Sequence, residues 1–549
     1  MPAESRAGMA ESHVGTRMER GSTMDISRRS FIKGAGLAGT AALGAAALAG
    51  CASTSSTQSA DAAGSSEAGR WSWSTAPEPI PDDKISDTYE CELCIVGAGV
   101  AGNPAALYAA KHGYDVIVLQ KESTPQVNGQ GCGSWNTKFG TENGLVWNIS
   151  NDIQNFAAIS NGKPNLRLVR NIMERSGAAI EWIVSEVPDP APSWDIVEDT
   201  HTGCQWILND DYATRYTGFK TLHNNIAAKA AEYGARYLYE TPAVQLVTDG
   251  ENNVVGVIGQ TGSSYVRVNA SKGVILCTGD ISDDEEMLEA YCPVMLDVPT
   301  NHAVATNTGD GLKMGLWVGA DMDDPPSGMQ MFITPSALPQ GTAPCVSLPY
   351  LHVNTEGKRF FNENGGDQYQ GTSIALQPDH RAYQIMDSHV VEHGSCTQEE
   401  LDEGLKLGNT YQSDTIEGLA DAVGIPADEL VRTVKRYNEL VDGGDDLDFG
   451  VDPEVLANNG IKDAPFYLME YQASKFVAAP GLTCNEYLQV LSKDRQVIKG
   501  LYAAGNVQGS FFGYDYPVNG FGGFSLGRSM TGGVLAVMSA TGTFDDEIA

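Results

Sequence analysis

The chain has 549 residues, which is enough for two or more domains with a large hydrophobic core. Its 35 Lys and Arg residues against 70 Asp and Glu residues leave a formal net charge of −35. This charge argues against a nucleic acid partner, which would need a basic face. Among the ten cysteines only Cys91 and Cys94 form a C-x-x-C pair, and no histidine follows it. We therefore predict neither a c-type haem nor a metal site, although distant cysteines could still meet as iron–sulfur ligands.

Residues 1–51 are typical of an export signal. Ser27–Lys33 has the twin-arginine pattern S-R-R-x-F-x-K, and Gly34–Gly50 is a weakly apolar run that is too short to be a convincing membrane span of ~20 residues. Cys51 then follows Leu-Ala-Gly, as in a lipoprotein signal. We predict an extracytoplasmic protein that is exported by the twin-arginine route and anchored to the cell membrane by a lipid on Cys51. The alternative is that Cys51 is incidental and a signal peptidase cuts nearby.

Residues 52–86 are predicted to be a disordered tether and a lead-in, because the first part is rich in Ser, Ala and Gly. The first domain is predicted to begin near Asp87. Cys91–Glu122 then has the pattern of a strand, a glycine turn, a helix and a second strand. This is the order of elements in which a dinucleotide-binding motif has a mechanism.

The glycine turn contains G-x-G-x-x-G at Gly97, Gly99 and Gly102. Gly97 allows a tight turn, Gly99 lets the backbone approach a pyrophosphate at the helix N-terminus, and Gly102 lets the helix pack on the strand. Placed within this βαβ pattern, the motif predicts a bound dinucleotide rather than an empty glycine turn.

Further elements follow in chain order. They are predicted as a second glycine loop at 128–134, helical segments at 150–185 and 221–233, strands at 244–248, 254–260 and 264–269, a buried strand at 273–279, and a helix at 312–319 after Thr308–Gly311. Residues 325–477 change character, with Pro-rich loops, the motif Asn354–Glu363 and a helical hairpin at 415–442 interrupted at 424–426. The chain then returns with a strand and turn at 500–506 and a last helix from Gly520–Gly523 to about Ser539. We interpret 325–477 as a second domain inserted into the first.

These motifs together resemble the flavoprotein family of soluble fumarate reductases. That family also contains urocanate reductase, 3-ketosteroid dehydrogenase and exported reductases of gut anaerobes, including the cardiac-glycoside type. The resemblance covers nearly the whole chain after the signal. It implies an α/β fold in which residues 87–324 and 478–549 form an FAD-binding Rossmann-like domain of the glutathione-reductase type, and 325–477 form an α+β capping domain.

The resemblance also implies which residues hold FAD. Gln120 stands where the family usually has a Glu for the adenosine ribose, and an amide can still accept a bond from a ribose hydroxyl. The last helix would direct its N-terminal dipole at the flavin and stabilise the reduced form. The implied contacts are Gly97, Gly99, Ala101, Gly102, Gln120, Lys121, Asn128, Gly129, Gly133, Ser134, Val244, Thr278, Gly279, Asp310, Gly505, Asn506, Gly522, Gly523, Ser525 and Leu526.

Four basic residues of the fumarate reductase site are missing. The positions at which the family has His or Arg are occupied by Thr334, by Asn364–Asp367, by Val477 and by Gly520. Because carboxylate recognition depends on charge-assisted bonds, we expect poor binding of fumarate. The alternative is that other basic residues, such as Arg381 or Arg528, have replaced them.

The loop Tyr514–Gly523 resembles that of the ketosteroid dehydrogenases, in which a tyrosine hydroxyl and a glycine N–H hold the substrate carbonyl. By this resemblance Tyr516 and Gly520 would form an oxyanion hole for an enolate. Tyr514, Asp515 and Tyr350 are candidates for the proton donor to the α-carbon. The alternative for Tyr516 is a packing aromatic. The phenylalanines near this loop favour an apolar, flat substrate.

The sequence therefore predicts an FAD-dependent oxidoreductase that reduces an activated C=C bond of a neutral carbonyl compound, with a steroid or a plant phenolic as candidates. Electrons are expected from a separate carrier, such as a membrane or secreted cytochrome or flavoprotein. The alternatives are an unsaturated-carboxylate reductase acting on fumarate, urocanate or cinnamate, a 3-ketosteroid dehydrogenase, and a non-catalytic flavin lipoprotein that relays electrons.

Overall fold

The computed structural model describes residues 70–127, 129, 131–188, 193–196, 204–207, 212–325, 327–335, 349–393, 396–514, 516 and 520–549. The signal predicted for 1–51 lies outside these residues, and so does the part of the predicted tether and lead-in (52–86) that precedes residue 70. Within the described part, no helix has both the length and the apolar character that crossing a membrane would require.

An eight-stranded sheet forms the base of the fold, with the order β16-β17-β9-β1-β2-β6 and with β7 and β8 joined to β9. Its strands are β1 (Ile85–Val96), β2 (Val116–Leu119), β6 (Arg236–Leu238), β7 (Ala243–Thr248), β8 (Val254–Thr261), β9 (Ser264–Leu276), β16 (Gln489–Leu491) and β17 (Val497–Ala503). The five strands β17, β9, β1, β2 and β6 are paired in parallel. All four residues of β2 are buried, as expected for a parallel strand covered on both faces.

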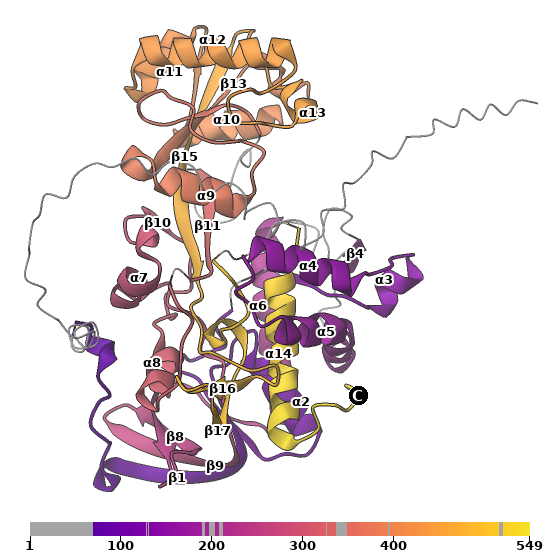
Figure 1. The fold of residues 1–549 in the computed structure, drawn as a ribbon, viewed down its shortest axis with the longest axis vertical. Coiled ribbons are helices and arrows are strands. Elements are labelled where there is room, and N and C mark those ends of the chain that lie inside the picture. The colour runs from indigo at the N-terminus through magenta and orange to yellow at the C-terminus, as the bar shows by residue number, and fades with distance from the viewer. Residues whose placement is uncertain are drawn as a thin grey trace, which may run out of the picture. The chain divides into compact units, whose positions relative to one another are not determined.

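The predicted βαβ unit is confirmed. The helix α2 (Gly102–Lys111) connects β1 to β2, which pair in parallel from Leu93 and Val116 onward. It packs against the C-terminal helix α14 (Phe524–Thr541), so two segments that are far apart in the sequence lie side by side (Figure 1). The close approach depends on Gly533, because a Cβ there would lie 2.1 Å from the carbonyl oxygen of Ala101.

One strand prediction is wrong. The segments 264–269 and 273–279 were expected to be two separate strands, but β9 is continuous from Ser264 to Leu276. The partner strand β1 continues beside it, with a register shift between Cys91 and Leu93. Gly273, with φ +125°, lets β9 pass this irregularity without a break.

A second sheet is built around the long strand β15 (Phe466–Ala478), which Figure 1 shows with β11 and β13. Its other strands are β10 (Thr300–Asn301), β11 (Met329–Pro335), β12 (His352–Val353), β13 (Arg381–Met386) and β14 (Thr410–Ser413). Its core lies between these strands and the predicted helical hairpin, which the structure resolves as α11 (Ile416–Val423) and α12 (Ala427–Gly443). The domain boundary at 325 stays a prediction, and β10 joins this sheet before it.

The remaining helices and strands connect or cover the two large sheets. The helices are α3 (Lys138–Glu142), α4 (Ile149–Ile159), α5 (Leu166–Glu186), α6 (Tyr212–Glu232), α7 (Glu285–Tyr291), α8 (Asp310–Trp317), α9 (Asp367–Ala375), α10 (Gln398–Leu407) and α13 (Pro453–Leu456). A small sheet pairs β3 (Gly131–Gly133) and β4 (Ser193–Ile196) with β5 (Cys204–Ile207). The predicted helix at 221–233 is the second half of α6.

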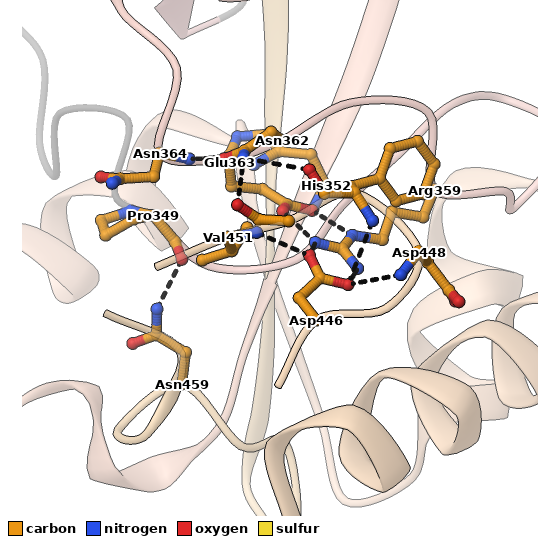
Figure 2. A network of polar contacts seen from close by, with 12 residues as sticks. Pro349, His352, Arg359, Asn362, Glu363, Asn364, Asp446, Asp448, Val451 and Asn459 are labelled. Atoms are coloured by element: carbon orange, nitrogen blue, oxygen red, sulfur yellow. Dashed lines mark hydrogen bonds and ion pairs between the residues drawn. The ribbon is translucent and has the colours of Figure 1, made fainter. Parts of the chain in front are cut away.

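The motif Asn354–Glu363 has a structural role in the second sheet. Figure 2 shows the guanidinium of Arg359 between the carboxylates of Glu363 and Asp446, with N–O distances of 2.6–3.0 Å. Both carboxylates are fully buried. Asn354 accepts backbone N–H bonds from Glu356 and Lys358 and shapes the turn that leads to this ion pair network.

Candidate functional site

A cavity of about 390 Å³ lies where the carboxyl ends of the parallel strands meet the start of α14 and the second sheet. Ligands of open α/β sheets bind at this edge. The cavity is lined by the loops after β1, β2, β9 and β17, by the first turn of α14, and by side chains of β11 and β15. The predicted residues that line it are Gly97, Gly99, Ala101, Gln120, Lys121, Gly129, Thr278, Gly279, Asp310, Gly505, Asn506, Tyr516, Gly522, Gly523, Ser525 and Leu526.

The glycine loop after β1 leaves backbone at the cavity wall. Gly97 has φ +101°, and a Cβ there would lie 2.4 Å from the carbonyl oxygen of Cys277. A Cβ on Gly102 would lie 1.8 Å from the carbonyl oxygen of Gly97, so Gly102 serves packing behind the loop rather than the cavity itself. At Gly99 the nearest atom is the carbonyl oxygen of Gln126, at 3.4 Å, so a Cβ there would meet no close protein atom. The N-terminal N–H groups of α2 lie beside this space, which suits a phosphate.

The end of β2 supplies a polar corner. The Oε1 of Gln120 accepts a bond from the N–H of Ala98 at 3.2 Å, and its Nε2 donates to the carbonyl oxygen of Thr124 at 2.9 Å. Both ends of the amide are therefore engaged by the backbone in this structure. The Nζ of Lys121 donates to the Oδ2 of Asp310 and to the hydroxyl of Thr308, each at 2.9 Å. The charge of Lys121 is therefore paired with that of Asp310.

Other predicted cofactor residues lie behind the cavity wall. The N–H of Gly133 donates to the carbonyl oxygen of Gly523 at 2.8 Å, which fixes the loop before α14. Ser134 is buried next to it and does not line the cavity. Val244 is also outside the lining, which contains the preceding residue Ala243. Asn128 lies outside the described residues.

Tyr516 is the one predicted catalytic side chain that the described structure brings to the cavity. It is 6% exposed, its ring lies 4.2 Å from that of Phe512, and its hydroxyl contacts that of Ser525. Burial raises the pKa of Tyr516 above its ordinary value, so the phenol keeps its proton at neutral pH and can donate a hydrogen bond.

The other predicted catalytic residues that the structure describes do not line the cavity. Gly520 has φ +77° and lies outside the lining. Tyr514 is 43% exposed, and its ring faces the ammonium group of Lys163 at 4.9 Å. Tyr350 is buried in a core of the second sheet with Met386 and Met469, because the strands β13 and β15 enclose it. Asp515 lies outside the described residues.

Several lining residues were not predicted from the sequence. Asp280 is buried, accepts bonds from the N–H and hydroxyl of Ser282 at 2.9 and 2.6 Å, and accepts another from Asn506 at 2.9 Å. Burial raises the pKa of Asp280, while these hydrogen bonds oppose that shift. Asp280 directly follows the buried strand predicted at 273–279, but its contact with Asn506, 226 residues away in the chain, has no local signal.

The substrate side is aromatic and carries little charge. The ring centroids of Phe332 in β11 and Phe476 in β15 lie 4.8 Å apart, and both side chains line the cavity. Among the described lining residues, Lys121 is the only Lys, Arg or His. Val477, one of the positions at which a basic residue was sought, contributes an apolar side chain to the wall. Within the described part of the chain, the cavity therefore has no unpaired cation.

The cavity fits a flavin dinucleotide. Its glycine-rich walls leave backbone exposed to a ligand, and two of those glycines, Gly279 and Gly505, have φ near +80°. The buried hydroxyl of Thr278 lines the cavity and has no hydrogen-bond partner among the described residues. A buried polar atom of this kind is ordinarily satisfied, so it points to a polar ligand at this wall.

Comparisons with known proteins agree. The sequence profile of the FAD binding domain family matches residues 92–522. The chain is 27% identical to the probable fumarate reductase of Shewanella frigidimarina, over 81% of this chain and 74% of that protein. It is 24% identical to the vinyl phenol reductase of Lactiplantibacillus plantarum, over 79% and 92% of the two chains. The solved open conformation of a flavocytochrome c3 fumarate reductase superposes with a TM-score of 0.66 at 25% identity, covering 86% of this chain and 83% of that one.

Proposed function

This chain belongs to the FAD binding domain family. We propose that it is an exported enzyme that reduces an activated C=C bond in a neutral carbonyl compound. The general class of its activity follows directly from the family and the relatives: the protein is an FAD-dependent oxidoreductase that acts on CH–CH groups. The neutral substrate, the separate electron donor and the export are our proposals.

The single observation that supports the proposal of a neutral substrate is the charge of the cavity wall. A bound carboxylate must lose its water, and it is stabilised in a protein by charge-assisted hydrogen bonds, most often from arginine. The described wall offers only Lys121, which is paired with Asp310. The aromatic side chains of Phe332, Phe476 and Phe512 instead suit an apolar, planar molecule. A neutral phenolic fits this class, and one relative is named a vinyl phenol reductase.

When FAD is bound, it would supply the hydride for the β-carbon of the substrate. The chain's part is to hold the carbonyl oxygen, on which negative charge develops. We propose that the phenol of Tyr516 donates to that oxygen, which is supported by its place in the cavity lining and by the contact of its hydroxyl with that of Ser525. Gly520, which the resemblance implies as the second donor, lies outside the cavity lining and is given no part in this proposal. Loss of one donor of this kind costs about 3 kcal/mol in the transition state.

Of the three proton donors that the sequence offers for the α-carbon, Asp515 lies outside the described residues and stays a prediction. Tyr514 is directed to Lys163 and Tyr350 lies in a separate core, so neither is placed to reach a substrate in this cavity. We assign this step to none of the described residues.

Export and the lipid anchor rest on the signal at Ser27–Lys33 and on Cys51. A further observation supports an oxidising compartment: Cys396 is disulfide-bonded, and structural disulfides are rare in the cytosol. The test is cell fractionation together with metabolic labelling by a fatty acid. We expect a labelled membrane fraction for the natural chain, an unlabelled and released protein for Cys51→Ala, and retention in the cytoplasm for Arg28→Lys with Arg29→Lys.

The substrate proposal is tested with purified holoprotein reduced anaerobically by a viologen and then mixed with electron acceptors. The panel contains fumarate, urocanate, cinnamate, a flavonoid, a vinyl phenol and a 3-ketosteroid enone. We expect fast reoxidation by a neutral member and slow reoxidation by the carboxylates. Fast reoxidation by fumarate would overturn the proposal, and reoxidation only by a protein partner would indicate an electron relay.

A further inference from the structure

A buried arginine lies directly behind the wall of the cavity. Arg528, the fifth residue of α14, is 0% exposed. Its Nη2 donates to the Oδ1 of Asn506 at 2.6 Å, and its guanidinium lies over the rings of Phe511 and Phe512 at 4.9 and 4.6 Å. Asn506 and Phe512 line the cavity, whereas Arg528 does not. One layer of side chains therefore separates the guanidinium from the ligand space.

Asn506 connects this arginine to a buried carboxylate. Its Nδ2 donates to the Oδ2 of Asp280 at 2.9 Å, on the opposite side of the amide from Arg528. The orientation of the amide is fixed by chemistry, since a flip would place NH2 against a guanidinium and oxygen against a carboxylate. One N–H and one lone pair of the amide remain. Because Asn506 and Asp280 both line the cavity, this edge of the amide is available to a ligand there.

The positive charge of Arg528 is incompletely compensated by the described protein. It is linked to Asp280 through the amide rather than by a direct contact, and its Nε and Nη1 have no hydrogen-bond partner among the described residues. Burial lowers the pKa of Arg528 to about 10, so the group is still charged at neutral pH. A buried charge is costly unless an opposite charge faces it directly, and the carboxylate of Asp280 reaches Arg528 only through the amide of Asn506.

We propose that Arg528 is a positioning residue for FAD, which fixes the amide of Asn506 and places a buried positive charge where it favours the reduced cofactor. When FAD is bound, two electrons from a donor and one proton from solvent would convert neutral oxidised flavin to a reduced form that carries a negative charge. A cation behind Asn506 and Phe512 stabilises that form more than the oxidised one. The proposal rests on FAD binding and is independent of which substrate is reduced.

Arg528 does not serve as a relocated clamp for a substrate carboxylate. Its side chain is fully buried and lies outside the lining, and Phe512 and Asn506 stand in front of it. A bidentate contact with a substrate would require the wall to open. We therefore expect the charge of Arg528 to act on the bound cofactor, and its effect on the potential of FAD should be measurable without any substrate.

The test is the midpoint potential of bound FAD, measured by equilibration with a redox dye, together with the Kd for oxidised FAD. Arg528→Met removes the charge and keeps an apolar side chain of similar length. We expect the preference for reduced over oxidised FAD to fall at least tenfold, which is a shift of about 30 mV to more negative potential for a two-electron couple. Arg528→Lys should retain most of the natural potential, because it keeps the charge.

Two further variants keep the test decisive. Arg175→Met is the matched control, since Arg175 is also partly buried and contacts α14 at the sulfur of Met538, far along the helix. It should leave the potential unchanged. Asp280→Asn removes the opposite charge and should move the potential to more positive values, which gives a result even if Arg528→Met does not bind FAD. A natural potential in Arg528→Met, or a negative shift in Asp280→Asn, would overturn the proposal, whatever the acceptor panel shows.

Discussion

The hydroxyl of Tyr516 contacts the hydroxyl of Ser525, the second residue of the C-terminal helix α14. This contact joins the predicted carbonyl-binding loop to the helix whose first turn lines the cavity. We infer that this contact orients the hydroxyl of Tyr516. Burial raises the pKa of Tyr516, so the phenol keeps the proton that it would donate.

Replacement of Tyr516 should slow turnover without loss of the cofactor. In Tyr516→Phe the ring still packs on Phe512, but the donor to the substrate oxygen is gone, so we expect kcat to fall by about 10²–10³. Ser525→Ala should cause a smaller fall, because it removes only the orienting contact. Steady-state rates with a neutral enone and the visible spectrum of bound FAD are the measurements. Tyr487→Phe, at an exposed tyrosine, is the control. Unchanged turnover in Tyr516→Phe would show that Tyr516 is a packing residue.

Two glycines of the G-x-G-x-x-G turn should respond differently to alanine. In Gly99→Ala the new Cβ meets only the carbonyl oxygen of Gln126, at 3.4 Å, so the apoprotein should keep its stability. The methyl group would stand where the pyrophosphate approaches, and we expect FAD to bind about tenfold more weakly or worse, ~1.4 kcal/mol. In Gly102→Ala the Cβ would lie 1.8 Å from the carbonyl oxygen of Gly97, so stability should fall by about 1–3 kcal/mol.

Equilibrium titration with FAD and urea unfolding of the apoproteins separate the two effects. If Gly99→Ala bound FAD with the natural affinity, the pyrophosphate would not lie on this turn.

The ion pair network of Arg359 should matter for stability rather than catalysis. Arg359→Met leaves the buried carboxylates of Glu363 and Asp446 without a counter-charge, and we expect a loss of about 3–5 kcal/mol. The neighbouring Lys358→Met is a matched control, because the pair between Lys358 and Glu356 is exposed and contributes little to stability. Urea midpoints of the holoproteins test this. Equal midpoints in the two variants would contradict it.

The buried carboxyl of Asp323 should give the protein a pH-dependent stability. Burial raises the pKa of Asp323 from 3.8 to about 6, although the N–H of Ser510 opposes the shift. Between these two values the folded protein binds more protons than the unfolded chain, so this contribution to stability falls as pH rises from about 4 to 6 and is constant above.

Asp323→Asn removes that dependence and keeps an oxygen that can accept from Ser510. The difference in unfolding free energy, natural minus variant, should fall by about 2–3 kcal/mol over this range. A difference that does not vary with pH would mean that Asp323 does not titrate in this way.

Local patterns predicted the parts of the fold that depend on neighbouring residues. The βαβ unit and the interruption of the helical hairpin at Gly424 were found because strand, turn and helix signals follow one another in the chain. The continuity of β9 was missed because Gly273 has the signature of a turn, and only pairing with β1 shows that the strand continues.

The site was predicted less completely, because it is assembled from distant segments. The contact of Asp280 with Asn506 and the position of Arg528 behind them require the strand order β17-β9-β1, which no local pattern contains. Tyr350 was a candidate by residue type alone, and the second sheet encloses it instead. Motif resemblance identified the cofactor and the loss of four basic residues, whereas the pairing of Lys121 with Asp310 and the burial of Arg528 required the fold.

The most direct test of a neutral substrate compares two acceptors of one shape. Benzalacetone and cinnamate share a phenyl ring and a C=C bond, but one carries a methyl ketone and the other a carboxylate. With viologen-reduced holoprotein, we expect kcat/KM for benzalacetone to exceed that for cinnamate by about 10² or more, since the described wall offers the carboxylate no unpaired cation. Equal values, or a preference for cinnamate, would contradict the proposed function.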